Sequence, residues 1–73
     1  MAIHNLDCKD MRCPMPIVRI SQAIKTIPAG DRLVIEANDP AFKADLEAWT
    51  RRLGHVLVEC HPGAVQRAVV EKR

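Results

Sequence analysis

The stretch MRCPMPIVRI, residues 11–20, marks the point where the hydrophobic pattern changes from strand-like to helix-like. In the segment before it, AIHNLDC, apolar and polar positions alternate, which places Leu6 and Cys8 on one face of a short strand. Beyond it, isoleucines recur at helical spacing and predict a helix over residues 14–27. The apolar stripe of that helix consists of Ile17, Ile20, Ile24 and Ile27. Isoleucine is a poor helix former, so burial of the stripe has to hold this helix.

A second strand and a second helix follow. The segment RLVIEAN, residues 32–38, alternates again and predicts a half-buried strand. Asp39 is then expected at the N-cap of a helix over residues 40–53, with Pro40 at its first position, where proline loses no hydrogen bond. The core stripe of this helix is predicted to be Phe42, Leu46, Trp49 and Leu53. Asp45 borders the stripe, and we assign it to the surface, outside any functional site.

The last third of the chain predicts two strands joined by a turn. The segment HVLVEC alternates, with Val56, Val58 and Cys60 on one face, and HPGA is typical of a turn. The order of elements is therefore β-α-β-α-β-β. One apolar stripe on each helix predicts an α/β two-layer sandwich, in which two helices cover one face of a four-stranded mixed sheet. The first two strands should be parallel, and the last two should form an antiparallel hairpin.

Length and composition limit the protein to one ordinary globular domain, residues 1–73, with 48% apolar and 27% charged residues. The net charge of +2 favours a mixed-sign solvated surface over direct nucleic-acid binding. No apolar run is long enough for a signal peptide or a membrane-spanning helix. Three cysteines, an odd number, fit a reducing compartment. We therefore expect a cytoplasmic protein without membrane insertion.

The CPMP motif indicates a presented thiol. We expect Cys13 at the N-cap and the two prolines, Pro14 and Pro16, at the first and third helical positions, where N–H groups have no intrahelical partner. The helix dipole, Arg12 and Lys9 all favour the thiolate, so the pKa of Cys13 should lie below its ordinary value.

Sulfur transfer is the chemistry that this motif favours. Among the first three helical residues only Met15 keeps an N–H, which we expect to point toward the sulfur of Cys13. A thioredoxin-type redox site needs a second cysteine where Pro16 stands, and a cysteine hydrolase needs a histidine base, yet no histidine here lies in a motif. Sulfur transfer needs only an exposed, nucleophilic sulfur and a docking surface. The residues expected to supply that surface are Arg12, Met15, Arg19 and Gln22.

The sequence resembles the TusA/SirA family of small sulfur-carrier proteins over nearly its whole length. The resemblance rests on the Leu-Asp pair before the first loop, the Cys-Pro-x-Pro helix start, the Gly-Asp pair before the second strand and the Asp-Pro pair before the second helix. One departure is Asp10, where family members often have glycine. The resemblance implies the βαβαββ sandwich and a persulfide carried on Cys13.

The resemblance also implies protein partners. The sulfur donor would be a cysteine desulfurase, a rhodanese-like protein or a thiosulfate-derived compound, and the acceptor would be a second protein. Thiouridine synthesis on tRNA, molybdenum-cofactor assembly and sulfur oxidation all remain open as destinations. No cofactor or metal is expected, and the free protein is expected to be a monomer.

The other two cysteines have simpler interpretations. Cys8 occupies an inward strand position, so a small core residue is the default, although a second thiol so near Cys13 could resolve or accept a persulfide. Cys60 follows the alternation of its strand and is also assigned to the core. A zinc site built from the three cysteines and His61 matches the usual ligand spacing poorly.

Two other classes of function remain open. One is a non-catalytic regulatory or RNA-binding module; the scattered basic residues and the absence of a stacking platform speak against it, because Phe42 and Trp49 are the only aromatics. The other is a thiol redox protein that uses a Cys8–Cys13 disulfide.

Overall fold

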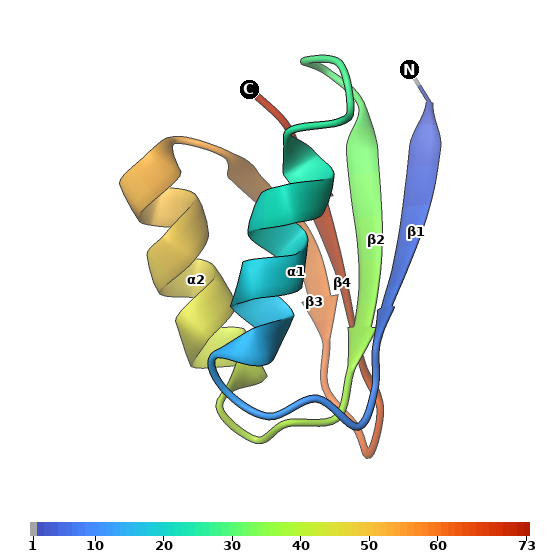
Figure 1. The fold of residues 1–73 in the computed structure, drawn as a ribbon, viewed down its shortest axis with the longest axis vertical. Helices are drawn as coiled ribbons and strands as arrows, with labels where there is room; N and C mark the ends of the chain where they lie inside the picture. Colours follow the sequence, from blue (N-terminus) through green and yellow to red (C-terminus); the bar gives the residue numbers. More distant parts are fainter. Residues whose placement is uncertain (1) are drawn as a thin grey trace.

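The computed structural model describes residues 2–73 and confirms the α/β two-layer sandwich (Figure 1). In chain order, its elements are β1 (Ile3–Cys8), α1 (Met15–Ile24), β2 (Arg32–Ala37), α2 (Phe42–Leu53), β3 (Val56–His61) and β4 (Gln66–Glu71). The sheet order is β1-β2-β4-β3, with β1 parallel to β2 and the other two pairs antiparallel. Both helices lie on the same face of the sheet, and both begin at the end where β1 and β2 finish (Figure 1).

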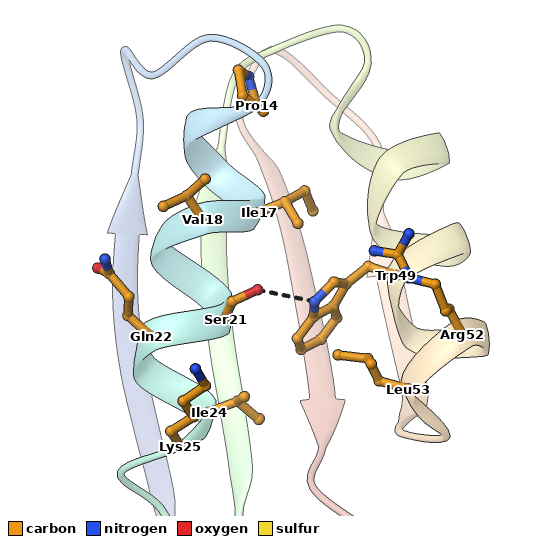
Figure 2. A pocket seen from close by; sticks show the side chains of 10 residues that line it. All are labelled: Pro14, Ile17, Val18, Ser21, Gln22, Ile24, Lys25, Trp49, Arg52 and Leu53. Carbon is orange, nitrogen blue, oxygen red and sulfur yellow. Dashed lines mark hydrogen bonds between the residues drawn. The ribbon is translucent and has the colours of Figure 1, made fainter.

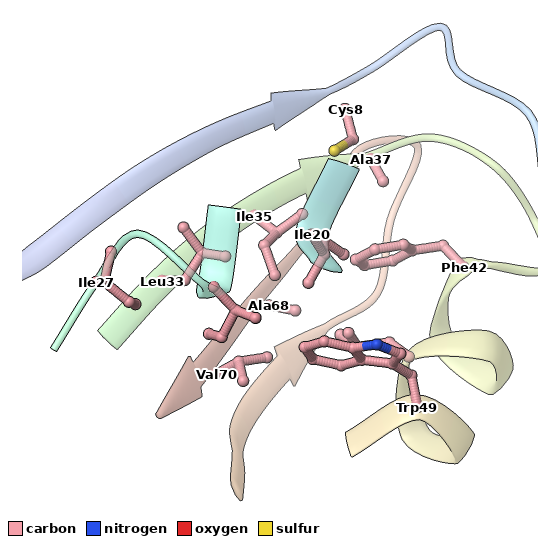
Figure 3. Close-up of a cluster of buried hydrophobic side chains, with 12 residues drawn as sticks. Cys8, Ile20, Ile27, Leu33, Ile35, Ala37, Phe42, Trp49, Ala68 and Val70 are labelled. Carbon is pink, nitrogen blue, oxygen red and sulfur yellow. The ribbon is translucent and has the colours of Figure 1, made fainter. Parts of the chain in front are cut away.

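The apolar core lies between the helices and the covered face of the sheet (Figure 3). The predicted alternation of the first two strands is confirmed, because Leu6 lies opposite Ile35 and both belong to the core. The sequence pattern leaves the inward face of β4 unassigned; the structure places Ala68 and Val70 there, with no exposed surface. One contiguous core therefore joins all four strands to both helices.

The predicted inward face of β3 is wrong at two of its three positions. Leu57 and Cys60 contact the core, whereas Val58 is 37% exposed. The register against β4 shifts between Leu57 and Glu59, which is a β-bulge. An extra residue on one strand reverses the alternation beyond it, so a strict period of two could not have placed these side chains.

α1 ends at Ile24, earlier than the predicted end at Ile27. The N–H and the hydroxyl of Thr26 both donate to the carbonyl of Ala23, at 3.0 and 2.7 Å, and this turn closes the helix. Ile27 precedes Pro28, and the residue before a proline disfavours helical geometry. Ile27 is still buried, so the apolar stripe continues into the core after the helix has ended.

α2 has the predicted core stripe except at its last residue. Leu53 is 52% exposed, which corrects its assignment to the core. The inward position of the last turn belongs instead to Thr50, which is buried and donates its hydroxyl to the carbonyl of Leu46 at 3.0 Å. Gly54 ends the helix in the left-handed conformation (φ 79°), as the sequence predicts.

Candidate functional site: an exposed thiol between two helix starts

Cys13 lies just outside α1 and not at its N-cap, which corrects the sequence-based prediction. The cap position is Pro14, the first helical residue is Met15, and no side chain caps the helix. The N–H of Met15 donates to the carbonyl of Arg12 at 2.7 Å and is therefore not a partner for the sulfur. Pro14 supplies the first carbonyl of the helix, to the N–H of Val18 at 3.1 Å, so the helix begins one residue later than expected. The thiol is exposed on the preceding loop.

Asp39 holds the backbone of Cys13. The sequence predicts Asp39 as the N-cap of α2, but the cap residue is Ala41 and no side-chain hydrogen bond caps this helix. Asp39 is 7% exposed, and its Oδ2 accepts the N–H of Cys13 at 3.1 Å. The side chain of Gln66 on β4 donates to the carbonyl of Asp39 at 2.8 Å. A buried carboxylate thus fixes the peptide of Cys13 and leaves its side chain in solvent.

Asp10 has a backbone conformation that glycine adopts more easily than aspartate. Its φ is 64°, in the left-handed region that glycine enters without strain. The N–H of Asp10 donates to Oδ1 of Asn38 at 2.9 Å, and Nδ2 of Asn38 donates back to Oδ1 of Asp10 at 3.3 Å. The loop before the thiol is therefore tied to the loop after β2 by a reciprocal pair of hydrogen bonds.

Asp45, which the sequence pattern assigns to the surface, shares a hollow with the thiol. Cys13 and Asp45 line one hollow of about 260 Å³, together with Trp49 and Arg52. Hydrogen bonding to Asp45 is the largest of the effects that raise the pKa of Cys13; partial loss of solvent and the charges of Asp45 and Asp39 add to it. The prediction of a lowered pKa is therefore wrong, because two carboxylates outweigh the helix dipole and the neighbouring cations.

A topological signal could have placed Asp45 in the site. Parallel pairing of β1 with β2 brings the starts of the following helices to one end of the molecule (Figure 1). Asp45 is the acidic residue in the first turn of α2. Helical periodicity locates it at the border of the core stripe, and on this helix that border faces the start of α1.

A groove of about 470 Å³ lies between α1 and α2 (Figure 2). It shares Ile17 and Trp49 with the hollow around Cys13, so the two lie next to each other. The indole N–H of Trp49 donates to Oγ of Ser21 at 3.0 Å across the groove, as the dashed line in Figure 2 shows. Two cationic side chains, Lys25 and Arg52, lie along its walls. The groove is therefore an apolar channel with basic borders.

The four predicted docking residues do not form one patch. Met15 is 46% exposed at the start of α1, and Gln22 lines the groove (Figure 2). Arg19 instead lines a hollow on the side of α1 next to Leu6 of β1. Arg12 lies in the loop before α1, in a hollow that it shares with the Asp10–Asn38 pair. Of the four, only Gln22 lines the groove, and it also lines the hollow of Arg19.

The other two cysteines are less exposed than Cys13. Cys8 has no exposed surface, and burial raises the pKa of its thiol. Cys60 is half-buried against the core, and all three cysteines are free. Within residues 2–73, no group of three or more histidine, cysteine, aspartate or glutamate side chains is placed to hold a metal ion. Of the helices described, neither is long and apolar enough to cross a membrane.

Known proteins match this chain over most of its length. "Putative sulfur carrier protein YrkI" of Bacillus subtilis is 44% identical over 54 residues, which cover 74% of this chain and 72% of that protein. "Putative sulfur carrier protein NMA0882" of Neisseria meningitidis is 37% identical over 59 residues, 81% of this chain and 80% of that protein.

A third relative is longer. "Putative sulfur carrier protein YrkF" of Bacillus subtilis is 48% identical over 50 residues, 68% of this chain, and the matched part makes up 27% of that protein. The chain therefore matches about a quarter of the length of YrkF. The family model described as "Sulfurtransferase TusA" matches residues 4–72, which include the exposed thiol, both helices and all of the sheet except Ile3. The chain belongs to the TusA sulfurtransferase family.

Proposed function

We propose that this chain is a sulfurtransferase that accepts a sulfur atom on Cys13 as a persulfide and passes it to an acceptor protein. In the loading step the sulfur of Cys13 attacks the outer sulfur of a donor persulfide. The donor sulfur–sulfur bond breaks, a new one forms on Cys13, and the thiol proton ends on the departing donor thiolate. Sulfur is transferred without net oxidation, so no cofactor is needed.

The observation that carries this proposal is the exposed Cys13 side chain on a fixed backbone. A carrier has to offer the same sulfur to two different partners, so its thiol must be accessible. Its N–H is held at 3.1 Å by the buried carboxylate of Asp39, which limits the positions that the sulfur can take. Pro14 and Pro16 support this positioning role, since Pro14 follows the thiol directly and Pro16 is buried in the first turn.

The raised pKa of Cys13 is compatible with this role. A higher pKa lowers the fraction of thiolate at neutral pH but raises the intrinsic nucleophilicity of the thiolate that forms. A thiol that stays protonated in solvent is also oxidised more slowly.

The groove between the helices is the proposed docking surface for donor and acceptor. Exposed apolar side chains lie along its two helices, with Val18 39% and Leu53 52% exposed. Because the groove lies next to the hollow around Cys13, a partner segment seated in it could bring its own sulfur near the thiol. Gln22, which lines the groove, is proposed to contact the seated segment, and Arg12, Met15 and Arg19 are proposed to contact the outer parts of a larger partner.

Intact-mass measurement after incubation with glutathione persulfide tests the proposal. The wild-type protein should gain about 32 Da, the mass of one sulfur atom, as expected for persulfidation. Cys13→Ser should lose this gain and keep its fold, because the side chain is exposed. Cys8→Ala and Cys60→Ala serve as controls and should load, since neither thiol is freely exposed. Normal loading of Cys13→Ser would contradict the proposal.

The two alternative functions have less support. A disulfide between Cys8 and Cys13 would have to form at a thiol with no exposed surface. An RNA-binding module would need exposed aromatic side chains for base stacking, yet Phe42 and Trp49 are 1% and 2% exposed.

A further inference from the structure

The strand β1 forms one border of the sheet, and no strand within residues 2–73 lies beyond it (Figure 1). All six of its residues, Ile3–Cys8, pair with β2 in a regular parallel register. Edge strands in native proteins are often protected by a lysine, a proline or a bulge. The sequence of β1, IHNLDC, has no lysine and no proline, and its register has no bulge, so this edge is open to a further strand.

The peptide groups along the outer edge of β1 are oriented for hydrogen bonds with such a strand. The carbonyl of Ala2 accepts the N–H of Arg32 at 3.0 Å, which sets the alternation of the parallel ladder. Residues at the even-numbered positions of β1 therefore turn their peptide groups toward β2. Ile3, Asn5 and Asp7 turn theirs away from the sheet, which offers about six hydrogen bonds to an added strand.

A hollow of about 330 Å³ lies beside this edge, between β1 and α1. Leu6 lines it from the strand, and the other lining residues belong to α1 and the turn after it: Arg19, Gln22, Ala23 and Thr26. Side chains of a strand alternate between its two faces. An added strand beside β1 would therefore direct every second side chain toward this hollow.

Arg19 gives the hollow a positive charge. Its side chain is exposed and forms no ion pair with another residue among 2–73, and the rest of the hollow is lined by neutral residues. Burial raises the pKa of the Cys8 thiol, and the charge of Arg19 opposes this rise, as expected for a guanidinium on the β1 side of α1. An acidic side chain on the added strand would find an unpaired cation here.

A second copy of this chain would fit the hollow poorly. The covered face of β1 carries His4, Leu6 and Cys8, so a second β1 would bring no carboxylate to the hollow. Antiparallel pairing of two β1 strands would also place two Arg19 side chains in one shared space, and like charges at such short range repel each other. The charge of the hollow therefore favours a different protein as the occupant.

We propose that β1 and the hollow beside it bind an extended segment of a partner protein, which adds to the sheet as a fifth strand and places an acidic side chain against Arg19. In this mode of recognition main-chain hydrogen bonds supply affinity and alternate side chains supply specificity. The surface is additional to the docking groove, because it lies on the other side of α1. β1 finishes at the end of the molecule that carries Cys13, so a partner held here extends toward the thiol (Figure 1).

Two backbone-cyclised β-hairpin peptides serve as probes. The outer strand of each alternates valine and threonine, with a central glutamate in one peptide and a central lysine in the other. Titration into isotope-labelled protein, followed by NMR, measures the dissociation constant and locates the contact. The glutamate hairpin should bind more tightly, and the N–H groups of Ile3, Asn5 and Asp7 should become protected from exchange with solvent. N-methylation of its outer strand should abolish binding, because the peptide loses its donors.

Three variants of the protein separate charge from main-chain pairing. Arg19→Glu should reverse the preference, so that the lysine hairpin binds several-fold more tightly than the glutamate hairpin. Asn5→Pro should prevent binding of both hairpins, because it removes an N–H from the open edge and none from the ladder with β2. Arg51→Glu makes the same change of charge at an exposed position on α2 and should bind both hairpins like wild type. Circular dichroism checks the fold of each variant, and the methylated hairpin repeats the main-chain test without changing the protein.

Four outcomes would overturn the inference. They are no binding of either hairpin to wild type, an unchanged preference in Arg19→Glu, and contact shifts that follow Val18 and Leu53 of the groove instead of β1. The fourth is a wild-type dimer in sedimentation experiments that Asn5→Pro abolishes, since the occupant would then be a second copy. Loading of Cys13 with sulfur is measured separately, so a failure to bind hairpins leaves the proposed function intact, and a failure to load sulfur leaves this surface intact.

Discussion

The two helix starts of this protein carry nearly the same local sequence signal and use it differently. Before α1 stands Cys13-Pro14, and before α2 stands Asp39-Pro40. Neither helix has a side-chain cap, although cysteine and aspartate were both predicted as caps. At the first start the side chain is exposed, whereas at the second it is 7% exposed and bonds to the other start.

This difference shows that a capping residue can serve a neighbouring element instead of its own helix. The side chain of Asp39 satisfies the N–H of Cys13 at 3.1 Å, while its contact with the N–H of Ala41 is long, at 3.5 Å. Local motif rules assume that a cap side chain bonds within its own first turn. In a parallel βαβα arrangement two helix starts are neighbours, and the better partner lies across the loop.

The largest expected effect on stability comes from the packing of α2, which has no side-chain cap. Trp49 is 2% exposed and donates its indole N–H to Ser21 of α1 at 3.0 Å. Trp49→Ala should lower the free energy of unfolding by about 3–5 kcal/mol, because it leaves a cavity in the core. Chemical denaturation measures this. Leu53→Ala, at the exposed end of the same helix, should change stability by only about 0.5 kcal/mol. Similar losses in both variants would mean that packing at Trp49 does not hold the helix.

Most of the fold could be predicted because the helices and strands carry apolar residues at regular spacing. Periodicity placed two strands and most of both core stripes, and the parallel pairing followed from chain order. Periodicity gave wrong assignments at two places. One is the bulge near Val58, where an extra residue interrupts the alternation, and the other is Leu53, where α2 ends. The site was predictable only in part. CPMP identified Cys13, but the positions of Asp39 and Asp45 depend on contacts between elements that no local motif encodes.

The bond between the two helix starts can be broken directly. Asp39→Ala leaves the N–H of Cys13 without its partner and should lower the free energy of unfolding by about 1–3 kcal/mol. Asp39→Asn keeps an oxygen that can accept this bond and should lose less. Urea denaturation of both variants checks the order. If Asp39→Ala were as stable as wild type, the hydrogen bond between Asp39 and the N–H of Cys13 would not contribute to stability.

The smallest expected effect on stability comes from the hydrogen bonds between Asp10 and Asn38, which join the other two loop segments. Asp10→Ala loses the bonds to Asn38 and keeps the left-handed backbone, so it should lower the free energy of unfolding by about 1 kcal/mol. Asp10→Gly loses the same bonds but relieves the left-handed strain of about 1 kcal/mol, so its stability should stay near wild type. Thermal melting of both variants distinguishes the two contributions. A glycine variant as unstable as the alanine variant would show that φ at this position costs nothing.

The bulge in β3 has a consequence for how the protein behaves in a crowded solution. β3 is one of the two edge strands of the sheet, and its register is interrupted between Leu57 and Glu59. A regular edge presents a continuous row of unpaired peptide groups to which another chain can add a strand, and a bulge interrupts that row. Along this border the bulge therefore disfavours addition of a strand from another copy, whereas β1 at the other border has a regular register.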